Sequence, residues 1–240
     1  MSSDEKKLSV LGHLGEVRQR LIKSVIAVVI TSTLSFIFFQ QIFNVLIAPA
    51  PQDITLIFIE MTEMIGTIMR VSLVSGIILA MPYLTYQLIM FVSPALTSKE
   101  KKYVYLILPW IALMFAAGVA FTYFILIPPA TNFLITFGSD IASPQIKIGN
   151  YISIVTRLLL AVGLVFEMPV VTTFLARLGV LKPKWLSDKR KLAIIFAFIL
   201  AAIITPTFDP INQTLVAAPL IVLYEMSIWL AKLAQRRKPI

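Results

Sequence analysis

The chain has 240 residues, 58% of them hydrophobic and only 14% charged, with a formal net charge of +9. A soluble domain of this size carries about a quarter charged residues, so the composition excludes a water-soluble globule and indicates a protein whose solvent is lipid. The chain has no cysteine, which excludes disulfides and thiolate-bound zinc or iron–sulfur centres.

Six apolar runs predict an all-α polytopic membrane protein with one domain over residues 1–240. A helix needs roughly 20 apolar residues to cross about 30 Å of hydrocarbon. The runs are continuous rather than alternating, so strands are not expected. The predicted spans are residues 24–42, 71–92, 104–127, 151–178, 192–204 and 214–230.

The segment before the first span, residues 1–23, is predicted to be cytoplasmic and amphipathic. Its apolar residues recur on one helical face, which is typical of a helix that lies on a membrane surface. The residues on that face are Leu11, Leu14, Val17 and Leu21.

Two acidic residues, Glu16 and Glu100, stand in strongly basic neighbourhoods beside predicted spans. Glu16 precedes Arg20 by four residues, a favourable ion pair on a helix surface. Glu100 is spaced from Thr97 as in a capping box that opens the third span. These structural interpretations account for both acids. A cationic ligand arriving there would still need local acids, because the surrounding field repels it.

The third predicted span ends at Pro128 and Pro129, and the fourth contains an acid, Glu167, slightly past its middle. An intramembrane carboxylate is a functional candidate by default, because a charge at that depth is costly. The structural alternative is a partner such as Arg70 that holds Glu167 inside the bundle. Glu167 also stands two residues before Pro169, which removes a helix hydrogen bond.

The fifth predicted span is short. Its 13 residues, at 1.5 Å each, reach about 20 Å. The stretch 205–213 that follows contains two prolines and an aspartate, which indicates a tight turn and a hairpin with the sixth span. The alternative is a buried helix that does not cross the membrane.

Seventeen of the 21 basic residues lie on one side of these spans, which the positive-inside rule assigns to the cytoplasm. They fall before the first span, between the second and third, between the fourth and fifth, and after the sixth. We therefore predict a multi-pass inner (cytoplasmic) membrane protein with both termini in the cytoplasm and a basic tail at residues 231–240. The alternation also favours counting the short fifth run as a span.

Enzyme motifs are missing from the chain. His13 is the only histidine, so neither an intramembrane Ser–His dyad nor an HExxH zinc site can be built, and a membrane protease is improbable. No glycine-rich phosphate loop is present. We predict no enzyme activity, metal, cofactor or nucleic-acid partner. One alternative is a proton-coupled secondary transporter of a small solute with Glu167 as its coupling site, although the matching halves usual in such folds are not found.

Several short motifs resemble the TatC family, the core receptor subunit of the twin-arginine protein translocase. Residues 13–21 read HLGEVRQRL and resemble the family's opening H-L-x-E-L-R-x-R-L, with Val17 in place of leucine. Residues 91–96, FVSPAL, resemble its first cytoplasmic loop, and residues 166–169, FEMP, resemble its F-E-x-P. Further matches in the last outer loop and sixth span are Thr205-Pro206, Asp209, Gln213-Thr214 and Pro219.

The resemblance implies six helices in a curved, cupped bundle whose fifth and sixth spans are short. It implies a receptor that binds Arg-Arg signal peptides at the cytoplasmic face. Such a receptor assembles with the single-span subunits TatA and TatB in an oligomeric complex, and exports folded proteins with the proton-motive force.

The resemblance also implies roles for individual residues. The signal-peptide site would comprise Glu16, Arg18, Phe91, Leu96 and Glu100, with the two acids receiving the twin arginines. Other implied positions are Glu167 and Arg70 as intramembrane polar groups, Pro49 and Asp209 in the outer loops, and Gln213 and Glu225 in the region where partner helices approach.

Overall fold

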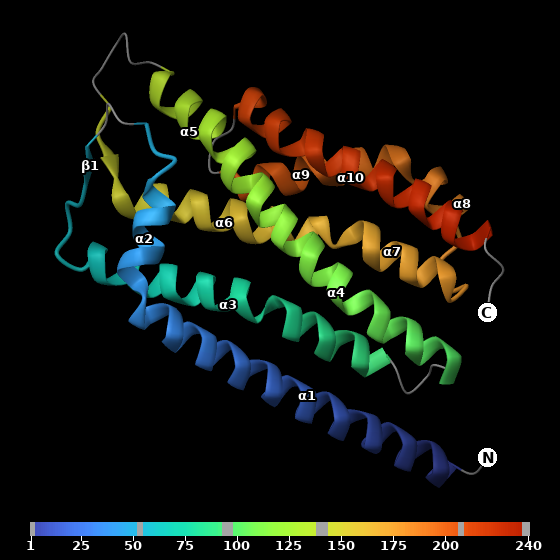
Figure 1. The fold of residues 1–240 in the computed structure, drawn as a ribbon. Helices are drawn as coiled ribbons and strands as arrows, with labels where there is room; N and C mark the ends of the chain where they lie inside the picture. The colour runs from blue at the N-terminus through green and yellow to red at the C-terminus, as the bar shows by residue number, and fades with distance from the viewer. Residues whose placement is uncertain (1–2, 52–54, 93–97, 138–143, 206–208, 237–240) are drawn as a thin grey trace.

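The computed structural model describes residues 3–51, 55–92, 98–137, 144–205 and 209–236, and only the backbone at residues 3–14, 91–92, 98–106 and 236. Helices dominate this part of the chain (Figure 1). They are α1 (Ser3–Ile37), α2 (Phe39–Ile47), α3 (Glu63–Val92), α4 (Ser98–Phe121), the π-helical turn η2 (Thr122–Leu126), α5 (Ile127–Thr136), α6 (Ile148–Phe166), α7 (Met168–Arg177), α8 (Pro183–Asp188), α9 (Arg190–Ile204) and α10 (Pro210–Arg236).

Two strands of two residues each, β1 (Leu56–Ile57) and β2 (Ile146–Lys147), pair in parallel outside the helices. They are an exception to the expectation of no strands. The all-α prediction otherwise holds for the described residues.

Five helical stretches are long and apolar enough to cross a membrane. They are Gly15–Ile37, Glu63–Met90, Ile107–Thr136, Ile148–Arg177 and Pro210–Gln235. The sixth predicted span corresponds to the last of these, and the fifth corresponds to α9. With 15 residues, α9 reaches about 22 Å, so it is short, as predicted.

The helices pack in an order that places α1 and α10 at opposite edges of the bundle (Figure 1). Helix α1 packs mainly on α3, α3 on α6 and α4, and α10 on α7 and α9. Helix α6 lies at the centre, where Ile152, Val155, Leu158 and Val162 are completely buried. The apolar stripe of α6 thus faces the core, while Asn150 and Arg157 are on its exposed side.

Both chain ends lie at the same end of the bundle, opposite α5 and β1 (Figure 1). An even number of crossings produces this arrangement. The end of α3, the start of α4 and helix α8 lie at the end of the bundle where the chain ends are, and β1, which pairs with β2, marks the other end (Figure 1).

Four predicted spans have wrong boundaries. The second begins at Glu63 instead of residue 71. The first span does not run to residue 42, because the helix breaks at Phe38 and restarts as α2. The third does not end at Pro128. The π-helical turn Thr122–Leu126, which precedes Pro128 and Pro129, is wider than an α-helical turn and so avoids a clash with the proline rings. The helix therefore continues to Thr136. The sixth span, predicted to be short, has 27 residues.

The length of α10 has a local cause at each end. Asp209 accepts a hydrogen bond from the backbone N–H of Asn212 at 2.6 Å, which caps the helix, and Pro210 occupies its first position. At the other end, Ala, Lys, Leu and Gln are good helix formers and carry the helix into the predicted basic tail. Likewise, α1 is continuous from Ser3, so the predicted amphipathic segment and the first span are one helix.

Close contact between α1 and α3 depends on a glycine. A Cβ on Gly76 would lie 2.5 Å from the Cα of Ser32 and 2.2 Å from its Oγ. The hydroxyl of Thr31 donates a hydrogen bond to the Gly76 carbonyl oxygen at 2.8 Å. Small residues allow helix backbones to approach in this way inside membranes.

We therefore expect Gly76→Ala to destabilise the protein by about 1–3 kcal/mol, the usual range for overpacking. Gly66→Ala on the same helix is the matched control, because a Cβ there meets nothing within 4 Å. Thermal unfolding in detergent measures both. Equal midpoints for the two variants would contradict the close α1–α3 contact.

Candidate functional site

Glu16 binds a guanidinium group in the structure. Its Oε1 accepts hydrogen bonds from Nη2 of Arg20 at 2.6 Å and from Nε at 3.1 Å. Among the described residues, no hydrogen bond reaches Oε2. The Glu16 side chain is 30% exposed, so the carboxylate remains accessible from water. The ion pair predicted from the spacing of the two residues is thus present, and it leaves acceptor capacity unused.

The same arginine links α1 to α3. Arg20 Nη1 donates to Oε1 of Gln87 at 3.5 Å, and Gln87 Nε2 donates to the Tyr83 hydroxyl at 2.6 Å. The amide of Gln87 is buried although it lies in an apolar span. This chain of polar contacts fixes Glu16 relative to the end of α3.

The other residues of the predicted signal-peptide site lie along the same end of the bundle or outside the described part. Arg18 is exposed on α1. Phe91 is one helical turn beyond Gln87 in α3, and Glu100 is in the first turn of α4, with neither side chain described. Leu96 and Thr97 lie outside the described residues. The structure thus brings the helices that carry Glu16 and Phe91 together, through α1–α3 packing.

Glu167 lies at a break between α6 and α7 and is buried, with 6% of its surface exposed. Its two carboxyl oxygens are 3.3 and 3.4 Å from the hydroxyl oxygen of Thr85 on α3. That hydroxyl is also 3.0 Å from the carbonyl oxygen of Met81, and it donates to one acceptor at a time. The helix break beside Pro169 follows the sequence expectation.

Arg70 was considered as the partner of Glu167, and this expectation is wrong. Arg70 lines a polar hollow of about 290 Å³ with Glu60, Glu63 and Lys147. This hollow lies at the start of α3 beside β2, at the opposite end of the bundle from Glu16. Arg70 therefore lies near one end of the bundle, away from Glu167, which is near the middle of its span.

Glu63 connects the chain segments around that hollow. Its carboxylate accepts hydrogen bonds from the backbone N–H of Ile59 at 3.0 Å and of Gly149 at 3.1 Å. Lys147 and Glu60 form an exposed ion pair at 3.5 Å. These contacts join the segment before α3 to the start of α6, beside the β1–β2 pairing.

The residues expected to face partner helices make contacts within the chain. Gln213 donates to the carbonyl oxygen of Phe198 at 3.0 Å, and Glu225 pairs with Arg190 at 2.8 Å, so both tie α10 to α9. Asp209 caps α10, and Pro49 is half-buried in the turn after α2. Their structural roles do not exclude contact with partners, since Glu225 is partly exposed.

Sequence reasoning did not identify Thr85, Gln87 and Tyr83 as members of these polar contacts. Their only signal was the presence of polar side chains within the apolar run 71–92. Which helix they meet is decided by packing, which the pattern of one run does not give. Among the described residues, no three His, Cys, Asp or Glu side chains gather as a metal site would require.

Comparisons with known proteins agree on one family. Residues 12–219 match the family model described as Sec-independent protein translocase protein (TatC). The chain is 41% identical to a TatC protein of Carboxydothermus hydrogenoformans over 230 residues, which is 95% of each chain. It is also 41% identical to one of Aquifex aeolicus over 231 residues, covering 94% of this chain and 95% of the relative.

A solved structure gives the same result. The chain is similar, with a TM-score of 0.85 and 41% identity, to a protein whose structure is described as the crystal structure of the twin-arginine translocase receptor TatC. The match covers 93% of this chain and 100% of the solved one. A similarity of this extent applies to the whole six-span fold, including the short α9.

The contact between Glu167 and Thr85 is expected to couple the two residues energetically. In a double-mutant cycle with Glu167→Leu and Thr85→Val, we expect a coupling free energy of about 0.6 kcal/mol, and at most about 1.7 kcal/mol, as for other hydrogen bonds between membrane helices. Thermal unfolding of the single and double variants in detergent measures it.

The matched control replaces Thr85→Val by Thr131→Val. Thr131 is also buried, and its hydroxyl donates to the carbonyl oxygen of Ile127 in its own helix. Its effect should add to that of Glu167→Leu. If the effects of Thr85→Val and Glu167→Leu are also additive, the side chains of Thr85 and Glu167 do not interact.

Proposed function

The chain belongs to the TatC family, the core receptor of the twin-arginine translocase, and on that premise we propose that Glu16 and Glu100 form its binding site for the arginine pair of a signal peptide. The protein is a non-enzymatic transport subunit that spans the membrane several times. The location of the peptide site on it is our proposal.

The observation that carries the proposal is the way Glu16 holds Arg20. A carboxylate that accepts two N–H groups of a guanidinium on one oxygen has the geometry needed for an arginine ligand. Its second oxygen has no recorded partner among the described residues, and water reaches the side chain. Arginine suits such a site better than lysine, because its planar fork makes two directed hydrogen bonds while lysine acts as a point charge.

Glu100 supplies the second acid of the proposed site. It lies in the first turn of α4, directly after the loop that leaves α3, and basic residues surround it in the sequence: Lys99, Lys101 and Lys102. An acid in such surroundings offers a cationic peptide a local attraction within a generally repulsive field. Phe91 at the end of α3, Arg18 on α1 and Leu96 in the intervening loop complete the proposed surface.

We further propose the cellular arrangement and the partners. The end of the bundle with both termini carries most of the basic residues, which supports a cytoplasmic location for that end in the inner membrane. TatA and TatB are the proposed single-span partners, approaching near Gln213 and Glu225, with the proton-motive force as energy source. The alternative of a small-solute transporter is not retained, since family membership accounts for the chain.

Neutralising the two acids tests the proposed site. We expect Glu16→Gln and Glu100→Gln each to weaken binding of a twin-arginine signal peptide by about tenfold, since each removes a charge-assisted hydrogen bond. Fluorescence anisotropy with the detergent-solubilised protein measures the affinity. A twin-lysine peptide is the matched ligand control and should bind weakly to every variant.

Two further results bear on the same experiment. Binding should weaken as salt is raised from 0.05 to about 0.5 M, because the contact joins exposed charges. Unchanged affinity in both variants, with unfolding midpoints like that of the parent, would refute the location of the site.

Arg20 is expected to compete with the peptide for Glu16. Arg20→Gln removes that internal cation, so peptide affinity should rise, by at most about fivefold, because a partly exposed ion pair contributes up to about 1 kcal/mol. Gln87→Ala is the control, since it removes the other contact of Arg20 and leaves the ion pair. A loss of affinity in Arg20→Gln alone would show that Arg20 positions Glu16 for the peptide instead of competing with it.

A further inference from the structure

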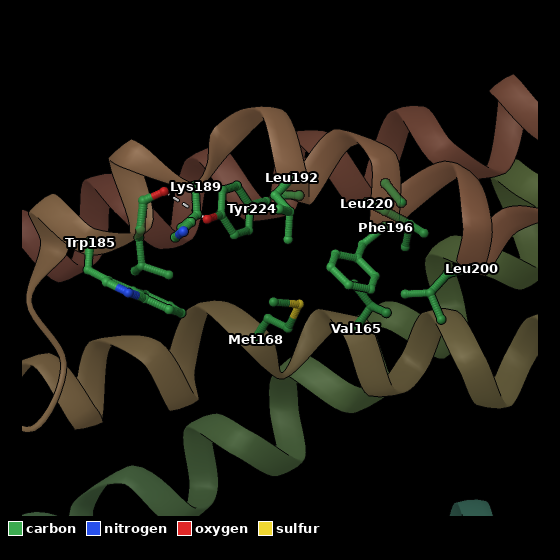
Figure 2. A pocket seen from close by; sticks show the side chains of 12 residues that line it. Val165, Met168, Trp185, Lys189, Leu192, Phe196, Leu200, Leu220 and Tyr224 are labelled. Atoms are coloured by element: carbon green, nitrogen blue, oxygen red, sulfur yellow. Dashed lines mark hydrogen bonds between the residues drawn. The ribbon is translucent and has the colours of Figure 1, made fainter.

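A second feature of the described residues is an apolar groove between α6 and α7 on one side and α8, α9 and α10 on the other. Figure 2 shows the side chains that line it. Its volume is about 550 Å³. The lining residues are Val165, Met168, Trp185, Leu186, Lys189, Leu192, Ala193, Phe196, Ala197, Leu200, Leu220 and Tyr224.

Lys189 is the only charged residue among those that line the groove. Two other lining side chains carry a polar group, Trp185 and Tyr224. Tyr224 is engaged, because its hydroxyl donates a hydrogen bond to the Leu186 carbonyl oxygen at 2.8 Å (Figure 2). No ion pair is recorded between Lys189 and the described residues. The groove thus offers a ligand a long apolar surface and, at one end, a single uncommitted cation.

The charges around that end are also mainly positive. Lys182, Lys184 and Lys191 are exposed there. Two acids are near in the chain or the fold: Asp188, which is exposed, and Glu225, whose charge is balanced by its ion pair with Arg190. An anionic group at Lys189 would therefore meet a net positive field.

The apolar part of the groove has the depth of one lipid leaflet. Lys189, which directly precedes α9, and then Leu192, Phe196 and Leu200 along α9 all line the groove. The eleven steps from Lys189 to Leu200 correspond to about 16 Å of helix, close to half of the roughly 30 Å hydrocarbon thickness. A transmembrane partner helix would need a contact surface over the whole thickness.

Trp185 marks the level of the membrane boundary at the charged end. Its ring lines the groove beside Lys189 and is 57% exposed (Figure 2). Tryptophan is enriched at the headgroup level of membranes, where its polar N–H and apolar ring are both accommodated. Below it, Leu192, Phe196 and Leu200 remain half exposed and need an apolar neighbour.

We propose that this groove binds one anionic phospholipid of the leaflet on the Lys189 side, with its phosphate at Lys189 and an acyl chain along Leu192, Phe196 and Leu200. The match of charge at the headgroup and of length along the chain selects this occupant. Basic pockets between membrane helices on the cytoplasmic side commonly bind such headgroups. This lipid site is separate from Glu16 and does not depend on the peptide-binding proposal.

The test compares two lipids with identical oleoyl chains, phosphatidylglycerol and phosphatidylcholine, titrated onto the detergent-purified full chain and followed by native mass spectrometry. We expect phosphatidylglycerol to bind more tightly. Lys189→Gln should weaken its binding by about fivefold, the effect of one basic residue near a phospholipid surface. It should weaken phosphatidylcholine binding less, because the choline cation offsets the charge of the phosphate. Lys189→Arg should preserve the preference.

Lys191→Gln is the matched control, because Lys191 is an exposed lysine two residues further along the chain that does not line the groove. It should weaken phosphatidylglycerol binding clearly less than Lys189→Gln does. Ala193→Phe, which narrows the groove, should weaken the binding of both lipids. Equal binding of the two lipids to the parent chain, or equal losses in Lys189→Gln and Lys191→Gln, would overturn the proposal. So would a photoreactive group at Phe196 that, in native membranes, labels a protein helix instead of lipid.

Discussion

Placing a charged side chain in hydrocarbon is costly, and this cost determines where most charged side chains of the protein lie. The Glu16–Arg20 and Glu60–Lys147 ion pairs lie at opposite ends of the bundle, where water can reach them. Two charged residue types stand within the fourth span: Arg157 is exposed on α6, and Glu167 is buried against the hydroxyl of Thr85 at a break in the helix. A carboxylate inside a span needs such a polar neighbour, because lipid supplies none.

The same cost places the acid of the proposed receptor site at the end of the bundle, on a well-supported helix. The helices α1 and α3 are held close by Gly76 and linked by Arg20 and Gln87, so Glu16 stands on a fixed support at the membrane boundary. A binding group on a rigid helix loses less freedom when a ligand arrives than one on a loop. The proposed lipid groove lies at a different edge of the bundle. It offers an anionic headgroup one cation, Lys189, and offers the acyl chain a long apolar surface.

Hydropathy and charge alternation were sufficient to predict the number of spans and the short α9, because both depend on how each segment meets lipid. The ends of the third and sixth spans could not be predicted in this way. A π-helical turn accommodates Pro128, and the Asp209 cap extends α10. Motifs identified Glu16 and Glu167. Their contacts with Arg20, Gln87 and Thr85, and the groove at Lys189, depend on which helices pack together, and a single sequence does not contain that information directly.

The central claim is that the arginine pair of a signal peptide is received at Glu16. It is tested most directly by photo-crosslinking from a peptide with a benzophenone beside its two arginines, followed by mapping of the labelled residues by mass spectrometry. The account predicts label in α1 near Glu16 and at the facing end of α3 near Tyr83 and Gln87. Label confined to the opposite end, around Glu60 and Lys147, would contradict it.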